Sequence, residues 1–386
     1  MANNNKHTGP NVPALRFPEF SGEWETCKLR SIGYAYNGLS GKSGSDFGVG
    51  APFITYKSVF DNSKIDIRRT GLVIITEQER LKHSQNIVQK GDAFFTISSE
   101  TPEEVGMSSV LLDDIDDCYL NSFCFGYRPT SNSVTSDYLR YYLRSPKLRK
   151  KIIILAQGST RFNISKDEVL NLTASLPSLD EQNKIARTLD LIEERIETQI
   201  KIIEEHETFL KSLADSLISS QLANMALNDC VVARSSAMKE SELENSGPFP
   251  VFGASGLCGY SNEALEKSDS ILVTKDGSGV GTCQYATGAH SFLGTLCSLT
   301  AKEGVYLPYV YYALLNFNFA SFKTGLAIPH IYFKDYGKAV IYCPSYDEQV
   351  RIASGLEKIE AKIKSEKEIL KQYQLQKEYL LSRMFI

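Results

Sequence analysis

Nine side chains in this sequence have the chemistry to contact a nucleic acid. Lysine, arginine and histidine can neutralise phosphates, and hydroxyl groups can form hydrogen bonds to phosphates or to base edges. Taken singly, each of them is more consistent with a solvated surface residue than with a nucleic-acid contact. Position favours Thr160, Arg161 and His330, because they lie in loops at corresponding places of an internal repeat. The candidates are Lys57, Arg68, Arg69, Thr160, Arg161, Lys275, Ser278, His330 and Lys334.

No group of residues predicts a catalytic or metal centre. Gly41-Lys42-Ser43 ends like a phosphate-binding loop, but position 36, where that loop needs glycine, is a tyrosine. The cysteines form no Cys-x-x-Cys pair and histidine is scarce, so a zinc site is not expected. The glycine-rich stretch from Gly277 to Gly281 fits a hairpin turn, and a loop that approaches phosphate or a DNA groove is the alternative.

Composition indicates a folded protein of two domains without a strong charge. The chain has 386 residues, of which 42% are hydrophobic and 10% aromatic, and its net charge is −4. This balance argues mildly against a nucleic-acid binder that acts through bulk charge. The sequence begins without a signal segment, and no apolar run approaches the roughly 18 residues of a membrane span. With unpaired cysteines, these features predict a cytoplasmic protein.

The segments that would position the candidate residues occur twice in the sequence. Pro177-Ser-Leu-Asp-Glu-Gln182 returns as Pro344-Ser-Tyr-Asp-Glu-Gln349, so the prolines are 167 positions apart. Identities continue at the same offset, for example Ile185 with Ile352. A shared period with a shared start indicates a duplicated unit.

Each copy predicts a long helix with a narrow apolar seam. An acidic residue stands just before each periodic region, where it complements a helix N-terminus. The apolar spacings are mostly four and three, the pattern of a coiled coil. The expected seam residues are Ile185, Leu189, Ile192, Ile196, Ile203, Leu210, Ile352, Leu356, Ile359, Ile363, Leu370 and Tyr373.

A seam on helices of this length needs a second helix to cover it. Two copies related by a two-fold axis would run antiparallel, so we expect an intramolecular antiparallel coiled coil. Homodimerisation through each helix separately is the alternative.

The segments before the helices predict two mixed α/β domains. Short runs rich in β-branched and aromatic residues predict strands, at 53–56, 72–75, 93–97, 110–112, 118–127, 231–232, 250–252, 271–274 and 291–300. Residues 136–154 and 309–315 are predicted as corresponding helices. The two halves show little other similarity, which suggests that each domain has its own task.

The expected fold is therefore α+β, with two globular α/β domains separated by two long helices in a pseudo-two-fold tandem repeat. The predicted segments are a disordered N-terminus (1–13), the first domain (14–176), the central helix (177–222), the second domain (223–343) and the C-terminal helix (344–386).

The pattern resembles the specificity subunits of type I restriction–modification systems. The resemblance covers almost the whole chain. It rests on the opening Leu15-Arg-Phe-Pro-Glu-Phe20 with Trp24, on the loop Gly158-Ser-Thr160, and on the repeated Pro-x-x-x-Glu-Gln before a long helix. Each motif alone is weak, whereas their order and the repeat make the combination specific.

The resemblance implies a non-catalytic protein with two target recognition domains, each reading half of a split, asymmetric double-stranded DNA site. The antiparallel helices would set the distance between the halves and dock two methyltransferase subunits, which restriction and translocation subunits join. S-adenosylmethionine, ATP and magnesium would bind those partners, with no cofactor in this chain.

Two other function classes remain open from the sequence. One is a structural protein whose domains bind other proteins, and the other is a sequence-specific DNA binder acting alone. A stand-alone methyltransferase is excluded, because no Asn-Pro or Asp-Pro step exists in the chain.

Overall fold

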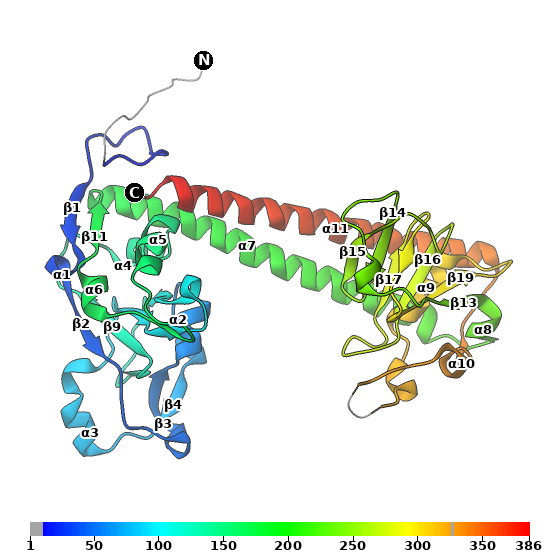
Figure 1. The fold of residues 1–386 in the computed structure, drawn as a ribbon, viewed down its shortest axis with the longest axis horizontal. Helices are drawn as coiled ribbons and strands as arrows, with labels where there is room; N and C mark the ends of the chain where they lie inside the picture. Colours follow the sequence, from blue (N-terminus) through cyan, green and yellow to red (C-terminus); the bar gives the residue numbers. More distant parts are fainter. Residues whose placement is uncertain (1–10, 326–327) are drawn as a thin grey trace. The chain divides into compact units, whose positions relative to one another are not determined.

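The computed structural model describes residues 11–325 and 328–386. The chain divides into two compact units, residues 1–198 with 371–386, and residues 199–370. Each unit contains one β-rich domain and part of two long helices, α7 (Leu179–Ala214) and α11 (Tyr346–Arg383) (Figure 1). The predicted α+β class with two domains and two long helices is confirmed.

The first domain is built around a four-stranded antiparallel sheet of order β2-β9-β5-β7. A three-stranded sheet, β4-β3-β8, contains one parallel pair, β3 with β8. Two short antiparallel pairs, β1 with β11 and β6 with β10, complete it. The strands are β1 (Glu25–Lys28), β2 (Gly33–Asn37), β3 (Phe47–Ile54), β4 (Gly71–Val73), β5 (Ala93–Thr96), β6 (Ser98–Ser99), β7 (Ser108–Val110), β8 (Tyr119–Leu120), β9 (Cys124–Pro129), β10 (Phe162–Asn163) and β11 (Thr173–Leu176).

Short helices connect these strands. Their bounds are α1 (Leu29–Ile32), α2 (Tyr56–Asp61), α3 (Glu77–Lys82), α4 (Ser136–Tyr142), α5 (Pro146–Ile154) and α6 (Lys166–Leu170). The single helix predicted at 136–154 is wrong, because Pro146 starts a new helix whose N-cap, Ser145, accepts a hydrogen bond from the Leu148 amide. Proline fits the first helical turn, and it disfavours helical backbone in the residue before it.

The second domain repeats this plan. Its four-stranded sheet has the order β13-β19-β16-β17, its three-stranded sheet β15-β14-β18 again contains a parallel pair, and β12 pairs with β20. The elements are β12 (Met225–Ala226), α8 (Leu227–Cys230), β13 (Val231–Ser235), β14 (Phe249–Gly253), β15 (Gly256–Ser261), β16 (Ser270–Thr274), β17 (Cys283–Ala286), β18 (Ser291–Phe292), β19 (Leu296–Ala301), α9 (Leu307–Leu315), α10 (Phe333–Tyr336) and β20 (Val340–Ile341).

The strand orders show that the two domains share a topology that their sequences do not reveal. In each four-stranded sheet the first strand pairs with the last, and the last also pairs with the strand that follows the first two strands of the three-stranded sheet. The duplication therefore includes the domains as well as the helices. The predicted strands are otherwise found with shifted ends: residue 56 starts α2, and the runs 118–127 and 291–300 are each split into two strands.

The long helices contact each other within each unit, and the contacting residues show that the two helices run antiparallel. In the first unit, Lys377 near the end of α11 pairs with Glu193 in the first half of α7. In the second unit, Gln199 of α7 donates to Glu366 of α11, and Lys367 pairs with Glu207. Figure 1 shows the two helices side by side. After α7 the chain continues as a π-helical turn, Asp215–Ser219.

The expected seam residues pack in two different ways. Ile203 and Leu210 share a core cluster with Ile352, Leu356 and Ile363, with Ile359 and Leu370 packed against it. Ile185 and Leu189 instead belong to the core of the first domain. Ile192 is buried, while Ile196 and Tyr373 are half-buried. The first turns of α7 are therefore part of a domain core as well as of a helix pair.

The N-terminal prediction falls mainly on residues 1–10, which lie outside the described residues. Asn11 accepts a hydrogen bond from the Trp24 amide through its carbonyl oxygen, and Pro13 is buried. In the described ranges, none of the helices is long and apolar enough to cross a membrane.

Candidate nucleic-acid interface

A buried glutamine joins each domain to its long helix, and the two joints are copies of one another. Gln182 Oε1 accepts from the Thr135 amide at 2.9 Å, and its Nε2 donates to the carbonyls of Ser133 and Pro177. In the second unit, Gln349 Oε1 accepts from the Tyr306 amide at 2.8 Å, and Nε2 donates to Pro344 and Gly304. The joint therefore holds the N-terminus of α4 or α9 through main-chain atoms alone.

The opening segment of the chain binds the same turn of α7. Arg16 forms a bidentate ion pair with Glu181, at 2.8 Å and 2.7 Å, and Trp24 Nε1 donates to the same carboxylate. Both members of the ion pair are almost fully buried. The corresponding residue of the second copy, Glu348, pairs with Arg351 at the surface instead. The opening motif of the chain and the repeated Pro-x-x-x-Glu-Gln motif thus meet at one contact, which positions the first domain.

A second repeated contact fixes the domain helix against the long helix. The Tyr141 hydroxyl donates to Glu193 at 3.1 Å, and the Tyr312 hydroxyl donates to Glu360 at 2.7 Å. These glutamates occupy corresponding positions of the repeat. Burial raises the pKa of both tyrosines, so each phenol remains a hydrogen-bond donor at neutral pH.

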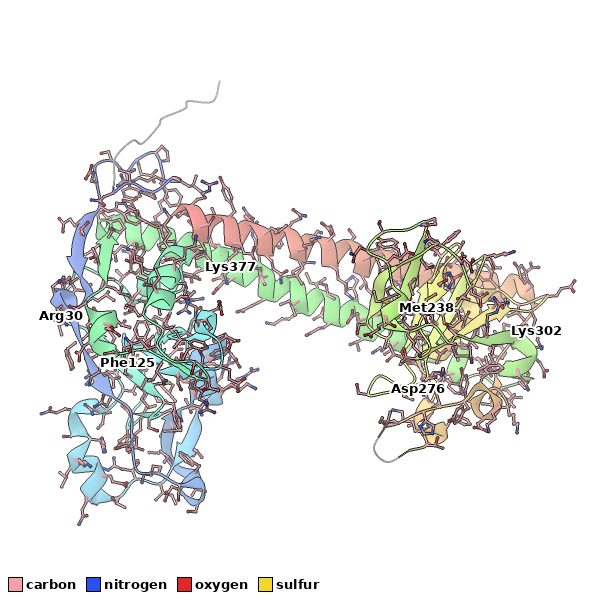
Figure 2. All side chains as sticks on the ribbon, in the orientation of Figure 1. Arg30, Phe125, Met238, Asp276, Lys302 and Lys377 are labelled. Atoms are coloured by element: carbon pink, nitrogen blue, oxygen red, sulfur yellow. The ribbon has the colours of Figure 1, made fainter. Side chains whose placement is uncertain are left out.

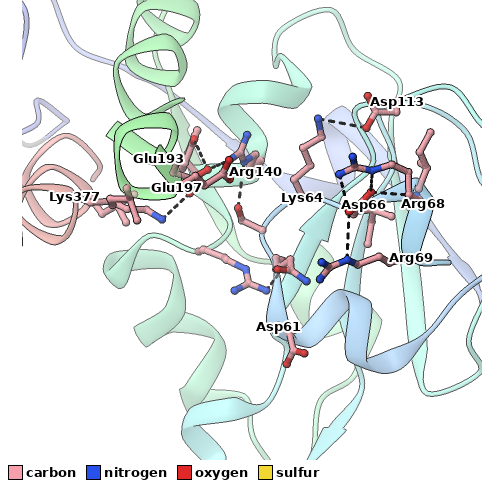
Figure 3. A pocket seen from close by; sticks show the side chains of 18 residues that line it. Asp61, Lys64, Asp66, Arg68, Arg69, Asp113, Arg140, Glu193, Glu197 and Lys377 are labelled. Carbon is pink, nitrogen blue, oxygen red and sulfur yellow. Dashed lines mark hydrogen bonds and ion pairs between the residues drawn. The ribbon is translucent and has the colours of Figure 1, made fainter. Parts of the chain in front are cut away.

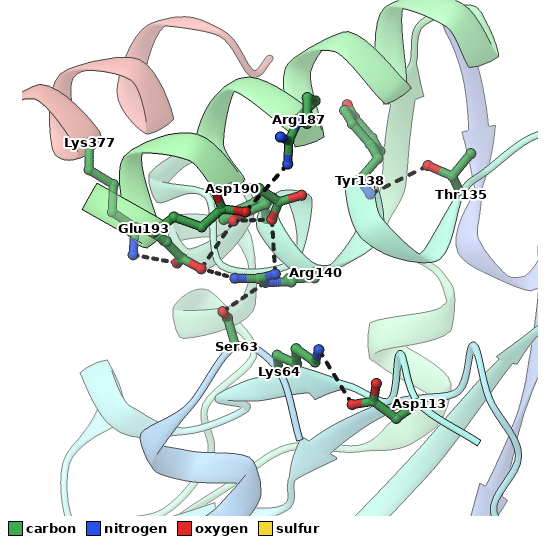
Figure 4. A network of polar contacts seen from close by, with 12 residues as sticks. Ser63, Lys64, Asp113, Thr135, Tyr138, Arg140, Arg187, Asp190, Glu193 and Lys377 are labelled. Atoms are coloured by element: carbon green, nitrogen blue, oxygen red, sulfur yellow. Dashed lines mark hydrogen bonds and ion pairs between the residues drawn. The ribbon is translucent and has the colours of Figure 1, made fainter. Parts of the chain in front are cut away.

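In the first unit, cations join this contact (Figure 4). Arg140 pairs with Asp190 at 3.0 Å and with Glu193, and its Nε donates to Ser63. Lys377 pairs with Glu193 at 2.6 Å. Burial, with the nearby Arg140 and Arg144 charges, lowers the pKa of Lys377. The second unit has Tyr311 beside Tyr312 at this place, so the joint has diverged around a common core.

Arg68 and Arg69 line a large cleft of about 890 Å³ in the first unit (Figure 3). Both guanidinium groups are strongly exposed, and both pair with Asp66. The cleft is also lined by Asp61, Asp113, Glu193 and Glu197. Its carboxylates offset its cations, so the cleft as a whole is not a phosphate site, although the exposed guanidinium groups of Arg68 and Arg69 remain accessible to a phosphate.

Arg161 lines a different, smaller cleft of about 350 Å³. Tyr56 and Phe60 stack beside each other there with ring centroids 5.9 Å apart, and Phe123 exposes 58% of its surface. Glu100 and Glu104 also line this cleft. Lys57 on α2 and Thr160 in the loop before β10 are both exposed. Each is next in sequence to a residue that lines the cleft, Tyr56 or Arg161.

The loops that carry Arg161 and His330 are closed in the same way. The amide and carbonyl of Gln157 pair with those of Asn163, as those of Thr324 do with His330. Gly158 and Gly325 both have positive φ, and a Cβ at Gly158 would lie 2.0 Å from the Arg161 carbonyl. Glycine is therefore required for the tight turn.

The structure brings the candidates of the second domain together. Asp276, labelled in Figure 2, forms a β-bridge with His330, and the Ile331 amide donates to the Lys275 carbonyl. Lys334 lies 5.4 Å from the centre of the Tyr332 ring. Ser278 is exposed in the Gly277–Gly281 stretch, which forms a hairpin turn between β16 and β17.

Sequence reasoning missed the residues of the joints. Glu181, Gln182 and Gln349 stood inside the repeated motif, and the repetition was the signal that could have identified them. In the described part of the chain, His, Cys, Asp and Glu form no group of three or more that could hold a metal ion.

Comparison with a family model gives two matches. The model described as Type I restriction modification DNA specificity domain matches residues 21–205 and 222–374. Each match covers one domain and part of the long helix that follows it, so the matches follow the internal repeat.

Two curated relatives carry the name of type I restriction enzyme specificity subunits. The one from Methanocaldococcus jannaschii, provisionally named MjaX, is 29% identical over 197 residues, which are 50% of this chain and 45% of the relative. The StySPI subunit from Salmonella potsdam is 26% identical over 162 residues, 42% of this chain and 34% of the relative. The chain thus spans about half or less of the length of these relatives.

Two solved structures share the fold. The crystal structure of the type I restriction–modification S subunit from M. genitalium has a TM-score of 0.60 at 17% identity, covering 97% of this chain and 99% of that one. A structure from a study of complex assembly and conformational transition of a type I system has a TM-score of 0.59 at 13% identity, covering 93% and 96%.

Proposed function

Because the chain belongs to the family of type I restriction–modification DNA specificity domains, we propose that it selects the DNA site of such a system. Each domain reads one half of a split, asymmetric double-stranded site. The chain itself performs no catalytic step, and methyl transfer, cleavage and translocation belong to partner subunits.

The repeated glutamine joint is the observation that carries this proposal. Apart from one contact of Gln349 with the Cys343 sulfur, Gln182 and Gln349 hold their domains by main-chain amides and carbonyls of the domain and of the strand end. Any sequence that keeps the backbone path can make these bonds. The joint therefore allows the base-reading surface of a domain to change while its attachment is kept, which suits a protein that determines specificity.

Bases would be read in the major groove, and phosphate contacts would set the register. Arg161, which is exposed, and His330, which is partly buried, stand in loops that are closed by the same pair of main-chain hydrogen bonds, one loop in each domain. We assign phosphate contacts to Lys57, Arg68, Arg69, Lys275 and Lys334, and hydrogen bonds to Thr160 and Ser278. Since the domains carry no excess of positive charge, tight binding depends on the surfaces of the partners and falls steeply with salt.

The partners in this proposal are two methyltransferase subunits docked on α7 and α11, with restriction and translocation subunits added to that core. Exposed apolar side chains on these helices support a docking role. Leu375 and Tyr379 expose 48% and 55% of their surfaces, four residues apart on α11. S-adenosylmethionine, ATP and magnesium would be held by the partners. The complex would work in the cytoplasm, where the chromosome is.

Co-expression with a type I methyltransferase subunit, followed by mapping of methylated adenine in the host genome, tests the proposal. The expected result is a split motif, two short defined halves around a fixed unspecified gap. Gel retardation with and without the methyltransferase distinguishes the alternatives. DNA binding by the chain alone would favour a stand-alone binder, and neither a complex nor DNA binding would favour a protein-interaction role.

A further inference from the structure

A third cleft of the first domain differs from the two clefts described above in having no carboxylate in its lining. Its volume is about 530 Å³. It lies between β2, the 3-10 turn Ser84–Asn86, β9 and the start of α6. We call it the amide cleft, and its polar lining includes Asn37, Gln85, Asn86, Gln89, Arg128 and Lys166.

The floor of the amide cleft is held by a buried carboxylate beneath it. Asp92 is 1% exposed, and Arg128 donates to it through Nε and Nη2, each at 2.7 Å. The Tyr36 hydroxyl donates to Asp92 at 2.6 Å, and the main-chain amide of Gln89 donates to the same carboxylate at 2.8 Å. The hydrogen bonds to Asp92 raise the pKa of Arg128. One buried group thus fixes the arginine and the turn that carries Gln89, so the site is organised before any ligand arrives.

The rim of the amide cleft presents unused hydrogen-bonding groups. The side chains of Gln85, Asn86 and Gln89 make no hydrogen bond within the described residues, and Gln85 and Gln89 are exposed. Lys166, which also lines the cleft, donates to Asn37 at 2.9 Å. Each free amide offers an acceptor and two donors side by side. This pattern complements the N6 and N7 edge of adenine in the major groove.

We propose that the amide cleft is where the first domain reads adenine-containing base pairs of its half-site, an inference that rests on the proposed function. The amides of Gln85, Asn86 and Gln89 contact base edges. Lys166 and the Nη1 group of Arg128 contact phosphates. Of the three clefts this one suits a polyanion best, because Asp or Glu in the linings of the other two offset the arginines there.

The test uses the full-length chain assembled with methyltransferase subunits. Methylated adenine is mapped for the wild type and for Asn86→Ala, Gln89→Ala and Gln89→Glu. Each alanine variant should lose discrimination about tenfold to a hundredfold at an A·T position of one half, and leave the other half intact. Gln89→Glu should disfavour adenine at that position, since a carboxylate accepts from cytosine N4. Lys166→Ala should weaken binding to all sequences and lower the salt slope by about one.

Gln78→Ala is the matched control, an exposed glutamine on α3 that does not line the cleft. Melting curves of the Asn86, Gln89 and Gln78 variants should match the wild type, because these side-chain amides make no hydrogen bond within the described residues. If the wild type methylates a split site and both halves stay defined in Asn86→Ala and Gln89→Ala, the assignment of the cleft is wrong, and the proposed function is unaffected. A wild-type complex that methylates no defined site overturns the proposed function, and the cleft with it.

Discussion

Gln199 and Glu366 occupy the same position of the two repeats, and they contact each other. Gln199 Nε2 donates to the Glu366 carboxylate at 2.5 Å and to the Glu366 carbonyl at 3.2 Å, and both residues are buried. Equivalent residues can meet only where a two-fold axis crosses a pair of helices. The pseudo-two-fold axis of the helix pair therefore passes between these side chains, where duplication has placed an amide against a carboxylate.

Gln199→Glu should destabilise the protein at neutral pH. It places two carboxylates at the axis, where Lys362 is the cation paired with Glu366. We expect the melting temperature to fall by several degrees, whereas Glu366→Gln, which keeps an amide pair, should change it little. Melting curves at pH 7 decide this, and an unchanged melting temperature for Gln199→Glu would contradict the symmetric contact.

The same pair predicts a dependence on pH. Hydrogen bonds from Lys362 and Gln199 lower the pKa of Glu366 below 4.5. A lowered pKa in the folded state gives stability that is present above pH 4.5 and lost as the pH falls through the folded pKa. The wild type should therefore lose stability relative to Glu366→Gln as the pH falls from 5 to 3, and melting curves over this range measure the change. In Gln199→Glu, protonation relieves the repulsion, so its deficit should shrink over the same range.

Gln182→Ala and Gln349→Ala should each loosen one domain. Removal of Gln182 leaves the Thr135 amide and two carbonyls without their partner, which costs about 1–3 kcal/mol when such groups are buried. Urea unfolding measures the loss, and limited proteolysis shows which domain opens. Gln376→Ala, an exposed position on α11, is the control. Equal proteolysis of both domains in each variant would refute separate joints.

The two long helices were predictable from the periodicity and the repetition in the sequence. Both long helices begin two residues after the repeated prolines, at Leu179 and Tyr346, because a proline start and a seam are local signals. The shared topology of the domains was not predictable. Strand order depends on pairings between distant segments, such as β2 with β9, and these leave no common pattern once the side chains differ.

The contacts of the site were less predictable than the helices. Arg16 and Glu181 were singled out only as parts of motifs, and their ion pair joins residues 165 positions apart. The basic candidates were chosen by charge, yet Arg68 and Arg69 already pair with Asp66. The free amides of Gln85 and Gln89 gave no signal, because their role depends on the absence of carboxylates around them in space.

Exchange of residues 30–157 for the corresponding segment of another specificity domain should change one half of the target only. The exchanged segment contains Ser133 and Thr135, but Gln182 uses their main-chain atoms, so the joint can form again. The methylated-adenine map gives the result. A change in both halves, or in neither, would show that the domains do not act as separate readers.

Deletion of one heptad from each long helix should shorten the gap between the halves. Removing residues 196–202 and 363–369 leaves the contacts of Glu193 with Lys377 in place, and a heptad keeps the seam on nearly the same face. The loss of about 10 Å of helix corresponds to about three base pairs. The deletion also removes Gln199 and Glu366, so a full-length control carries Gln199→Leu with Glu366→Leu. A methylated site with an unchanged gap in the deletion variant would mean that the helices do not set the spacing.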